Sequence, residues 1–314
     1  MKKYVRKINY LEYIKEYGLQ LFVSKAIRRR SLNNDSIFGE KINNYNEKLV
    51  LNRLNRIFKY EYFEEEIYFK PKCQVPPETI WIMWWQGYNN APNLVKACIN
   101  SVKINNKNHN VIIITQENFK DYVMLPNFIL KKFENGYISI THLSDIIRVL
   151  LLYNYGGLWI DSTVLNISSI NRKVFDSTFF SIRTGLETKE PSHGEWTTFF
   201  MASHPKNKLM KKIAVSHFKF WKNHNEVIDY IMFDYIIRLL VLENDKFSKQ
   251  VLMVPINNVK TFELRKYINN QYSEVVDEVS SIKNDTILFK LSRKDNLLKK
   301  DGTVYSHILN KYLK

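Results

Sequence analysis

Apolar positions along the chain follow two patterns, which are short unbroken runs and longer stretches with helical spacing. The short runs are typical of buried strands, and apolar residues three or four positions apart are typical of amphipathic helices. Strands are predicted at 79–85, 110–118, 177–183, 196–202, 251–256 and 286–292, and helices at 91–106, 127–135, 145–155, 205–222 and 226–243. Because the strand runs are apolar without alternation, we predict an α/β sheet covered by helices on both faces.

The first 30 residues combine apolar side chains at helical spacing with many Lys and Arg residues. The apolar positions are Tyr10, Ile14, Tyr17 and Leu21, and the stretch ends in three consecutive arginines. It is either a basic amphipathic helix on an anionic membrane surface or a helix packed on the rest of the protein.

Polar and proline-rich segments divide this N-terminal part from the remainder. The Asn-rich stretch 31–46 predicts a loop, 47–66 a second helix, and the prolines of 71–78 an extended entry into the main domain. We therefore predict a basic helical extension at 1–70 and one main domain at 71–314.

Composition narrows the class of protein. The 314 residues are 45% hydrophobic and 14% aromatic, as in a globular protein, and carry a formal net charge of +16. Such a charge suits nucleic acid, an anionic membrane or phosphorylated small molecules. The two cysteines lack metal-site spacing, and no secretory signal or membrane span is evident, so we expect a cytoplasmic protein with reduced thiols.

Three charged residues stand out in the middle of the chain. Ser144 is a candidate cap for a helix that contains Asp145 and Arg148 among apolar residues, and two glycines then lead to a strand ending at Asp161. Buried charges are costly unless paired, so Asp145 and Arg148 either pair with each other or face a polar ligand near Asp161. In α/β sheets such ligands lie beyond the carboxyl ends of the strands, where Gln86 also falls.

The pattern SD-x-x-R-x-x-x-L-x-x-x-GG-x-x-x-D, from Ser144 to Asp161, resembles the sugar-binding motif of glycosyltransferase family 32 and of related bacterial capsular polysaccharide synthesis proteins. Blocks at 80–101, 195–203, 229–235, 254–258 and 288–292 resemble the capsular family in the same order, so the resemblance covers roughly 75–295. It implies a GT-A-like, nucleotide-binding mixed sheet flanked by helices. It also implies sugar transfer from a nucleotide-sugar donor to a capsular or surface polysaccharide unit, with a polyprenyl-diphosphate-linked oligosaccharide as acceptor.

The resemblance also implies roles for individual residues. Asp161 matches the first acid of a DxD motif that holds Mn²⁺ or Mg²⁺, Asp145 the acid that contacts the donor, and Arg148 the base that orients these carboxylates. The other implied donor-binding residues are Trp81, Trp85, Gln86, Gly156 and Gly157. Thr163 stands where the family has a second carboxylate, so we expect the metal to be held by Asp161 and Thr163, weakly in the absence of donor.

Further residues follow from what the chemistry requires. Lys290 is a candidate for neutralising the donor diphosphate, and the alternative is a solvated basic strand end. Asp234, Glu195 and Asp229 are candidate bases for an acceptor hydroxyl, and Asp234 is favoured because its helix is otherwise apolar. Its alternative role is a cap or salt bridge.

The predicted function is that of a metal-dependent, hexosyltransferase-type enzyme at the inner face of the cell membrane, without a nucleic-acid partner. Two alternatives remain, a non-enzymatic basic protein that binds nucleic acid or membrane and a degenerate transferase that only binds donor. The histidines lack metal-site spacing, and no glycine-rich phosphate loop is present.

Overall fold

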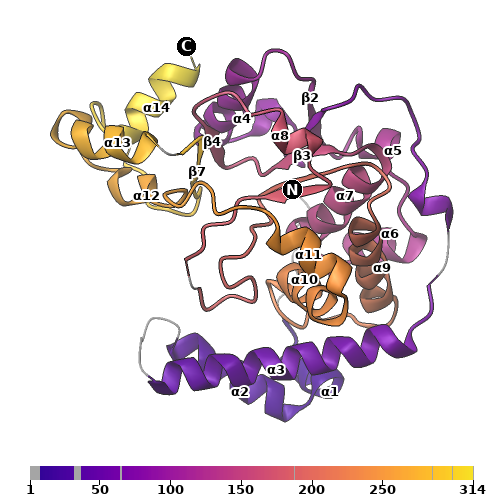
Figure 1. Cartoon of the computed structure of the whole chain (residues 1–314). Helices are drawn as coiled ribbons and strands as arrows, with labels where there is room; N and C mark the ends of the chain where they lie inside the picture. Colours follow the sequence, from indigo (N-terminus) through magenta and orange to yellow (C-terminus); the bar gives the residue numbers. More distant parts are fainter. Residues whose placement is uncertain are drawn as a thin grey trace.

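The computed structural model describes residues 8–31, 37–63, 66–186, 188–284, 286–298 and 300–313. Its centre is a five-stranded sheet with the order β2-β1-β3-β6-β5 (Figure 1). The strands are β1 (Ile80–Met83), β2 (Val111–Ile114), β3 (Gly157–Ile160), β5 (Phe179–Ser181) and β6 (Phe200–Ser203). β1 is parallel to β2 and β3, whereas β6 is antiparallel to β3 and β5. The predicted mixed α/β class is confirmed.

Alternate strand residues enter two different apolar cores, because successive side chains point to opposite faces of a sheet. Trp81 and Trp159 join the core beneath α7 and α9, whereas Ile80 and Leu158 join the core beneath α4. The helices around the sheet are α4 (Asn93–Asn105), α5 (Phe119–Tyr122), α6 (Asn127–Glu134), α7 (Ile140–Tyr155), α8 (Lys173–Asp176), α9 (Lys208–Asn223) and α10 (Met232–Glu243). The sheet is therefore covered on both faces, as predicted.

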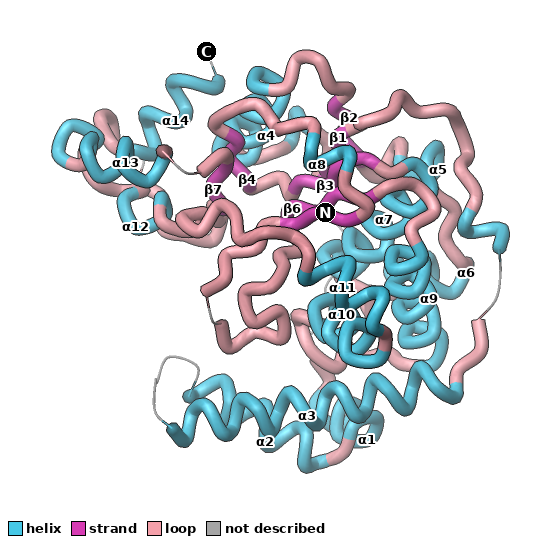
Figure 2. The backbone as a smooth tube through the Cα atoms, in the orientation of Figure 1, coloured by secondary structure: helices cyan, strands magenta, loops and turns pink. Residues whose placement is uncertain are grey.

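A second sheet, the two-stranded β4–β7 ribbon, packs against the C-terminal helices (Figure 2). It pairs β4 (Val164–Asn166) with β7 (Leu288–Lys290) in antiparallel register, with Val164 opposite Lys290. Helices α12 (Leu264–Tyr267), α13 (Val276–Lys283) and α14 (Val304–Leu313) form a third apolar core with the ribbon, and α14 packs on α4. Short 3₁₀ turns lie at Glu66–Phe69, Tyr88–Asn90 and Tyr272–Glu274.

Three N-terminal helices lie along one side of the molecule: α1 (Tyr10–Tyr17), α2 (Leu19–Ser31) and α3 (Ile37–Tyr60) (Figure 1). The Tyr13 hydroxyl donates to the Ile228 carbonyl at 2.8 Å, and the Tyr17 hydroxyl donates to the Glu226 carbonyl. This face of the predicted amphipathic helix is packed on the protein. The predicted domain boundary near residue 70 stays a prediction.

The loop predicted at 31–46 is wrong from Ile37 onward, where α3 begins; residues 32–36 lie outside the described residues. Two asparagines of this stretch, Asn43 and Asn46, are buried in a helix–helix contact. Asn43 Oδ1 accepts from Arg28 Nε at 2.7 Å, and Asn46 Oδ1 accepts from Ser24 Oγ at 2.9 Å. Partners on α2 therefore satisfy side chains that would otherwise compete with the helix backbone.

The strand predicted at 251–256 is also wrong, because helix α11 (Asp245–Leu252) occupies its first part. Asn244 Oδ1 accepts from the backbone N–H groups of Lys246 and Phe247, so a side-chain cap starts this helix. The helix predicted at 226–243 begins later, at Met232, and the strand predicted at 196–202 pairs only over Phe200–Ser203. Among the described helices, none is both long and apolar enough to cross a membrane.

Candidate functional site

Helix α7 carries two of the predicted site residues and begins earlier than predicted. The Ser139 hydroxyl caps it by accepting from His142 N at 3.2 Å, so the predicted cap at Ser144 is wrong and Ser144 lies inside the helix. The helix ends at Tyr155, and the Gly156 N–H donates to the Leu152 carbonyl at 3.0 Å. Asp145 and Arg148 thus lie one turn apart on a helix that is buried almost throughout.

Gly156 and Gly157 form the turn that leads from α7 into β3. Both have positive φ, +70° and +88°, and a Cβ on Gly157 would lie 2.2 Å from the Thr79 carbonyl oxygen. Trp81 Nε1 also donates to the Gly156 carbonyl at 3.0 Å. The two glycines therefore let β3 start directly against β1, which fixes where β3 ends.

Asp161 follows the last residue of β3 and accepts hydrogen bonds on both carboxylate oxygens. Oδ1 lies 2.9 Å from Trp159 Nε1 and 3.4 Å from an Arg148 guanidinium nitrogen, and Oδ2 lies 2.7 Å from Lys290 Nζ. The same Arg148 nitrogen lies 3.2 Å from Asp145 Oδ1. The structure thus brings Asp145, Arg148, Asp161 and Lys290 into one network. Asp145 and Arg148 pair with each other, and that they also face a polar ligand near Asp161 stays a prediction.

Two aromatic rings and a carbonyl fix the Arg148 side chain. Its guanidinium lies over the rings of Trp159 and Phe233, 4.9 and 5.1 Å from their centroids, and donates to the Thr198 carbonyl at 2.5 Å. The sequence reasoning missed these partners. Trp159 could have been found, because it lies two residues before Asp161 and therefore on the same face of β3.

The two acids of the network have opposite pKa shifts. Burial raises the pKa of Asp145 to about 6, although Arg148 opposes the shift. For Asp161, burial also acts to raise the pKa, but the ammonium of Lys290 and the guanidinium of Arg148 outweigh it and lower the pKa to about 2. Asp161 is therefore ionised at neutral pH, and its side chain is 29% exposed.

Lys290 reaches the site from the ribbon. Its Nζ lies 2.7 Å from Asp161 Oδ2 and 3.0 Å from Thr163 Oγ1, so the two predicted metal ligands converge on one cation. Convergence of two hard oxygens on a cation is what a shared Mg²⁺ or Mn²⁺ requires, so these residues fit such an ion once the ammonium moves away. No cluster of three or more His, Cys, Asp or Glu side chains suited to a metal occurs among the described residues.

The candidate bases differ in their surroundings. Asp234 Oδ1 accepts from Trp196 Nε1 at 2.9 Å, and burial followed by the charge of Glu190 raises its pKa to about 7. Glu195 pairs with Arg238 at 3.0 Å. Asp229 pairs with Lys25 of α2 at 3.2 Å, so it ties the N-terminal helices to the protein.

The predicted donor-pocket residues on and after β1 are not all exposed. Trp81 is 0% exposed, and its ring packs on those of Tyr122 and Tyr155. Trp85 is buried against Phe119 and Phe133. Both rings belong to the core, and only Gln86 is partly exposed.

The sequence model of the capsular polysaccharide synthesis protein family matches residues 31–308. The chain belongs to the capsular polysaccharide synthesis protein family. The family resemblance predicted from the sequence is confirmed, and the match extends beyond 75–295 at both ends, into α3 and α14.

Other comparisons add little to this family assignment. No significant match to a curated protein was found. Among solved structures, the chain is similar to the "PaToxG Glycosyltransferase", with 16% identity and a TM-score of 0.34 over 68% of this chain and 89% of that one. We draw nothing from a likeness at that score.

Proposed function

We propose that this member of the capsular polysaccharide synthesis family is a glycosyltransferase that moves a sugar from a nucleotide-sugar donor to a growing surface polysaccharide. The observation that carries the proposal is the ionised, partly exposed Asp161 at the end of β3, held by Arg148 and Lys290. Ligands of α/β sheets bind beyond the carboxyl ends of the strands, which is where this network lies.

The two cations suit the leaving group of the proposed reaction. A departing nucleoside diphosphate gains negative charge in the transition state, and preorganised cations stabilise that charge. Lys290 is 21% exposed and can contact phosphate oxygens directly, whereas Arg148 is almost fully buried and orients Asp161. Asp145, which contacts the same Arg148 nitrogen as Asp161, completes the charge balance of the network.

Asp161 and Thr163 are the residues that would hold Mn²⁺ or Mg²⁺. Bound there, the ion would neutralise charge on the donor diphosphate and supply no proton chemistry. Lys290 binds the same two oxygens, so it competes for them, and we expect weak metal binding in the absence of donor.

Asp234 is the proposed base for the acceptor hydroxyl. A carboxylate with a pKa of about 7 exchanges protons readily at neutral pH. Trp196 donates to Oδ1, and no hydrogen bond to Oδ2 occurs among the described residues, so we assign Oδ2 to the acceptor hydroxyl. Glu195 is less suitable, because Arg238 neutralises it.

The proposed acceptor is lipid-linked, and the N-terminal helices offer a surface for the membrane that carries it. Leu19, Val23 and Ile27, four residues apart on α2, are 61%, 44% and 37% exposed. Arg29 and Arg30 at the end of α2 are also exposed. An apolar stripe beside arginines suits the interface of an anionic bilayer.

A donor-binding protein without transferase activity is the second candidate. Its support is the Lys290 ammonium, which already binds the oxygens of Asp161 and Thr163. A nucleic-acid-binding protein is supported only by the net charge of +16.

Thermal unfolding with a panel of ligands separates these classes. UDP-, GDP- and CDP-sugars with Mn²⁺ should each be tested, and one of them should raise the melting temperature of the wild type but not of Asp161→Asn. If oligonucleotides raise it and no nucleotide-sugar does, the glycosyltransferase proposal fails.

A further inference from the structure

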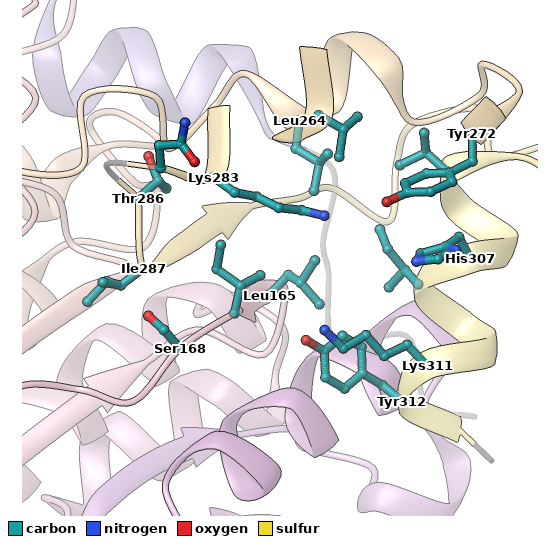
Figure 3. Close-up of a pocket in the computed structure, with 15 residues that line it drawn as sticks. Leu165, Ser168, Leu264, Tyr272, Lys283, Thr286, Ile287, His307, Lys311 and Tyr312 are labelled. Atoms are coloured by element: carbon teal, nitrogen blue, oxygen red, sulfur yellow. The ribbon is translucent and has the colours of Figure 1, made fainter. Parts of the chain in front are cut away.

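A pocket of about 610 Å³ lies in the C-terminal part of the fold, between β4 and helices α13 and α14 (Figure 3). Part of its wall is apolar and comes from β4, α12, α13 and α14: Leu165, Leu264, Val279, Val304 and Ile308. Packing voids in proteins rarely exceed a water molecule, and ligand pockets occupy roughly 300–1,000 Å³. The hollow therefore has the size and lining of a ligand site.

The pocket is separate from the site at Asp161, and the β4–β7 ribbon lies between them. Lys290 on one face of the ribbon contacts Asp161. Leu165 and Phe289 on the other face belong to the third apolar core, and Leu165 lines the pocket. Since side chains alternate along a strand, the two sites use opposite faces of the same two strands.

Two lysines from different helices reach into the pocket. Lys283 lies in the last turn of α13 and Lys311 in the last turn of α14, and Figure 3 shows both ammonium groups turned toward the centre of the pocket. Burial and the charge of Lys311 lower the pKa of Lys283. Within the described ranges, neither lysine forms an ion pair with an Asp or Glu. Their ammonium groups instead lie over aromatic rings, Lys283 at 5.9 Å from the centroid of Tyr272 and Lys311 at 5.2 Å from that of Tyr312.

Two buried hydroxyl groups in the wall also have no partner among the described residues. These are Tyr312 Oη and Thr286 Oγ1, and each residue is 4% exposed. Buried polar groups are normally hydrogen-bonded, so each of these hydroxyls has an unused capacity to donate a hydrogen bond. Figure 3 shows the Tyr312 hydroxyl beside the Lys311 ammonium, on the side that faces the pocket.

A helix dipole favours a cation in the last turn of a helix, which accounts for the positions of Lys283 and Lys311 at the ends of α13 and α14. The dipole does not account for a large apolar hollow with two unpartnered hydroxyls. An acceptor-rich anion with a hydrocarbon chain satisfies all these groups together. Phosphate suits them better than a single carboxylate, because it carries up to two charges and several acceptor oxygens for two ammonium groups.

We propose that this pocket binds an amphiphile made of a phosphate headgroup on a hydrocarbon chain. The headgroup lies between Lys283 and Lys311, and the chain lies against Leu165, Val279 and Ile308. Binding at this site does not depend on the proposed transferase activity, so failure of either leaves the other standing.

Calorimetric titration of the full chain tests the site with three probes below their micellar concentrations: n-decyl phosphate, n-decanol and inorganic phosphate. We expect decyl phosphate to bind at least about tenfold more tightly than either of the others, because only it engages both the lysines and the apolar wall. Equal affinity for decanol or for inorganic phosphate, or no binding of decyl phosphate, overturns the proposal.

Substitutions in the pocket wall test whether decyl phosphate binds in this pocket. The double variant Lys283→Gln/Lys311→Gln should bind decyl phosphate at least about tenfold more weakly than the wild type. The control Lys246→Gln/Lys249→Gln removes the same charge from exposed positions on α11 and should bind it as the wild type does. Ser168→Trp, at a partly exposed position of the pocket wall, should also weaken it by filling space. Circular dichroism verifies the fold of each variant. Equal loss in both double variants, or full binding by Ser168→Trp, contradicts the assignment.

Discussion

Arg148 contacts both acids of the site, yet their pKa values move in opposite directions. Asp145 is 6% exposed and has a pKa raised by burial to about 6, whereas Asp161 also receives the Lys290 ammonium and has a pKa lowered to about 2. Acids whose surroundings separate their pKa values are suited to different roles. Asp161 is the permanent anion of the site, and Asp145 can take up a proton near neutral pH.

Lys290→Met tests the competition between the ammonium and a metal. In the absence of donor, the variant should bind Mn²⁺ roughly tenfold more tightly, since one charge-assisted hydrogen bond of about 1.5 kcal/mol no longer needs to be broken. The electron paramagnetic resonance signal of aqueous Mn²⁺ measures this directly. Lys246→Met, at an exposed position, is the control. Unchanged or weaker Mn²⁺ binding by Lys290→Met would show that Asp161 and Thr163 do not hold the metal.

Asp234→Asn tests the raised pKa of the proposed base. The pKa of Asp234 rises on folding from 3.8 to about 7, so the folded state binds the extra proton and this residue's contribution to stability falls as pH rises from about 4 to 7. Asp234→Asn removes that loss. Its free energy of unfolding relative to wild type should increase between pH 5 and 8 by on the order of 1 kcal/mol, reduced from the full shift because the side chain is partly exposed.

Urea unfolding at both pH values measures this difference. The comparison with wild type is needed because buried histidines such as His142 and His217 have lowered pKa values and contribute a slope of opposite sign. A variant whose stability runs parallel to wild type from pH 5 to 8 would mean that Asp234 is ionised throughout.

The sequence predicted the local part of this site better than its distant part. Asp145, Arg148 and Asp161 lie within one helix–turn–strand unit, so their proximity follows from the chain itself. The contact of Lys290 with Asp161 spans 129 residues and depends on the pairing of β4 with β7. The three-residue strand β4 carries no pattern strong enough to reveal that pairing.

At the scale of the elements, the unit from α7 through the two glycines to β3 places the acid. It was predictable because an apolar helix, a pair of glycines and an apolar strand each carry a local signal. The start of α3 and helix α11 were mispredicted for a different reason. Their asparagines are satisfied by partners on α2 or by capping, and side-chain satisfaction of that kind depends on the folded context.

Gly157→Ala tests whether the close approach of this turn to Thr79 requires glycine. The variant should lose roughly 1–3 kcal/mol through the positive φ and about 1–3 kcal/mol more because the new Cβ meets the Thr79 carbonyl. Gly87→Ala is the matched control, since Gly87 also has positive φ (+80°) but no atom within 4 Å of the added Cβ. Urea midpoints measure both. Equal losses in the two variants would mean that the contact with Thr79 is easily relieved.

At the scale of the whole molecule, the N-terminal helices belong to the largest apolar core and also present a second apolar face. Val50 and Leu54 of α3 lie in the same core as Trp81 and Trp159 of the sheet. The helical spacing of Tyr17 and Leu21 predicted the packed face, but the sequence did not show that Leu19 and Val23 would remain exposed. Which apolar stripe is buried depends on how α2 docks on α3.

Sedimentation with lipid vesicles tests that exposed stripe. The protein should bind vesicles that contain phosphatidylglycerol and not vesicles of phosphatidylcholine alone, because the surface combines apolar and cationic side chains. Leu19→Ser/Val23→Ser should weaken binding at least about tenfold, given about 1.5 kcal/mol or more for each buried side chain. Leu242→Ser/Met253→Ser changes exposed apolar residues elsewhere and serves as control. Equal loss in both variants would contradict a membrane role for α2.

The most direct test of the central claim is release of nucleoside diphosphate from a panel of UDP-, GDP- and CDP-sugars in the presence of Mn²⁺. The wild type should turn over at least one donor. Asp161→Asn should reduce that rate by roughly 10²-fold or more while the variant remains folded in the absence of urea, with a urea midpoint lowered by the loss of the ion pairs with Arg148 and Lys290. Turnover by Asp161→Asn at the wild-type rate, or no turnover of any donor by the wild type, would contradict the assignment of Asp161 to a glycosyltransferase site.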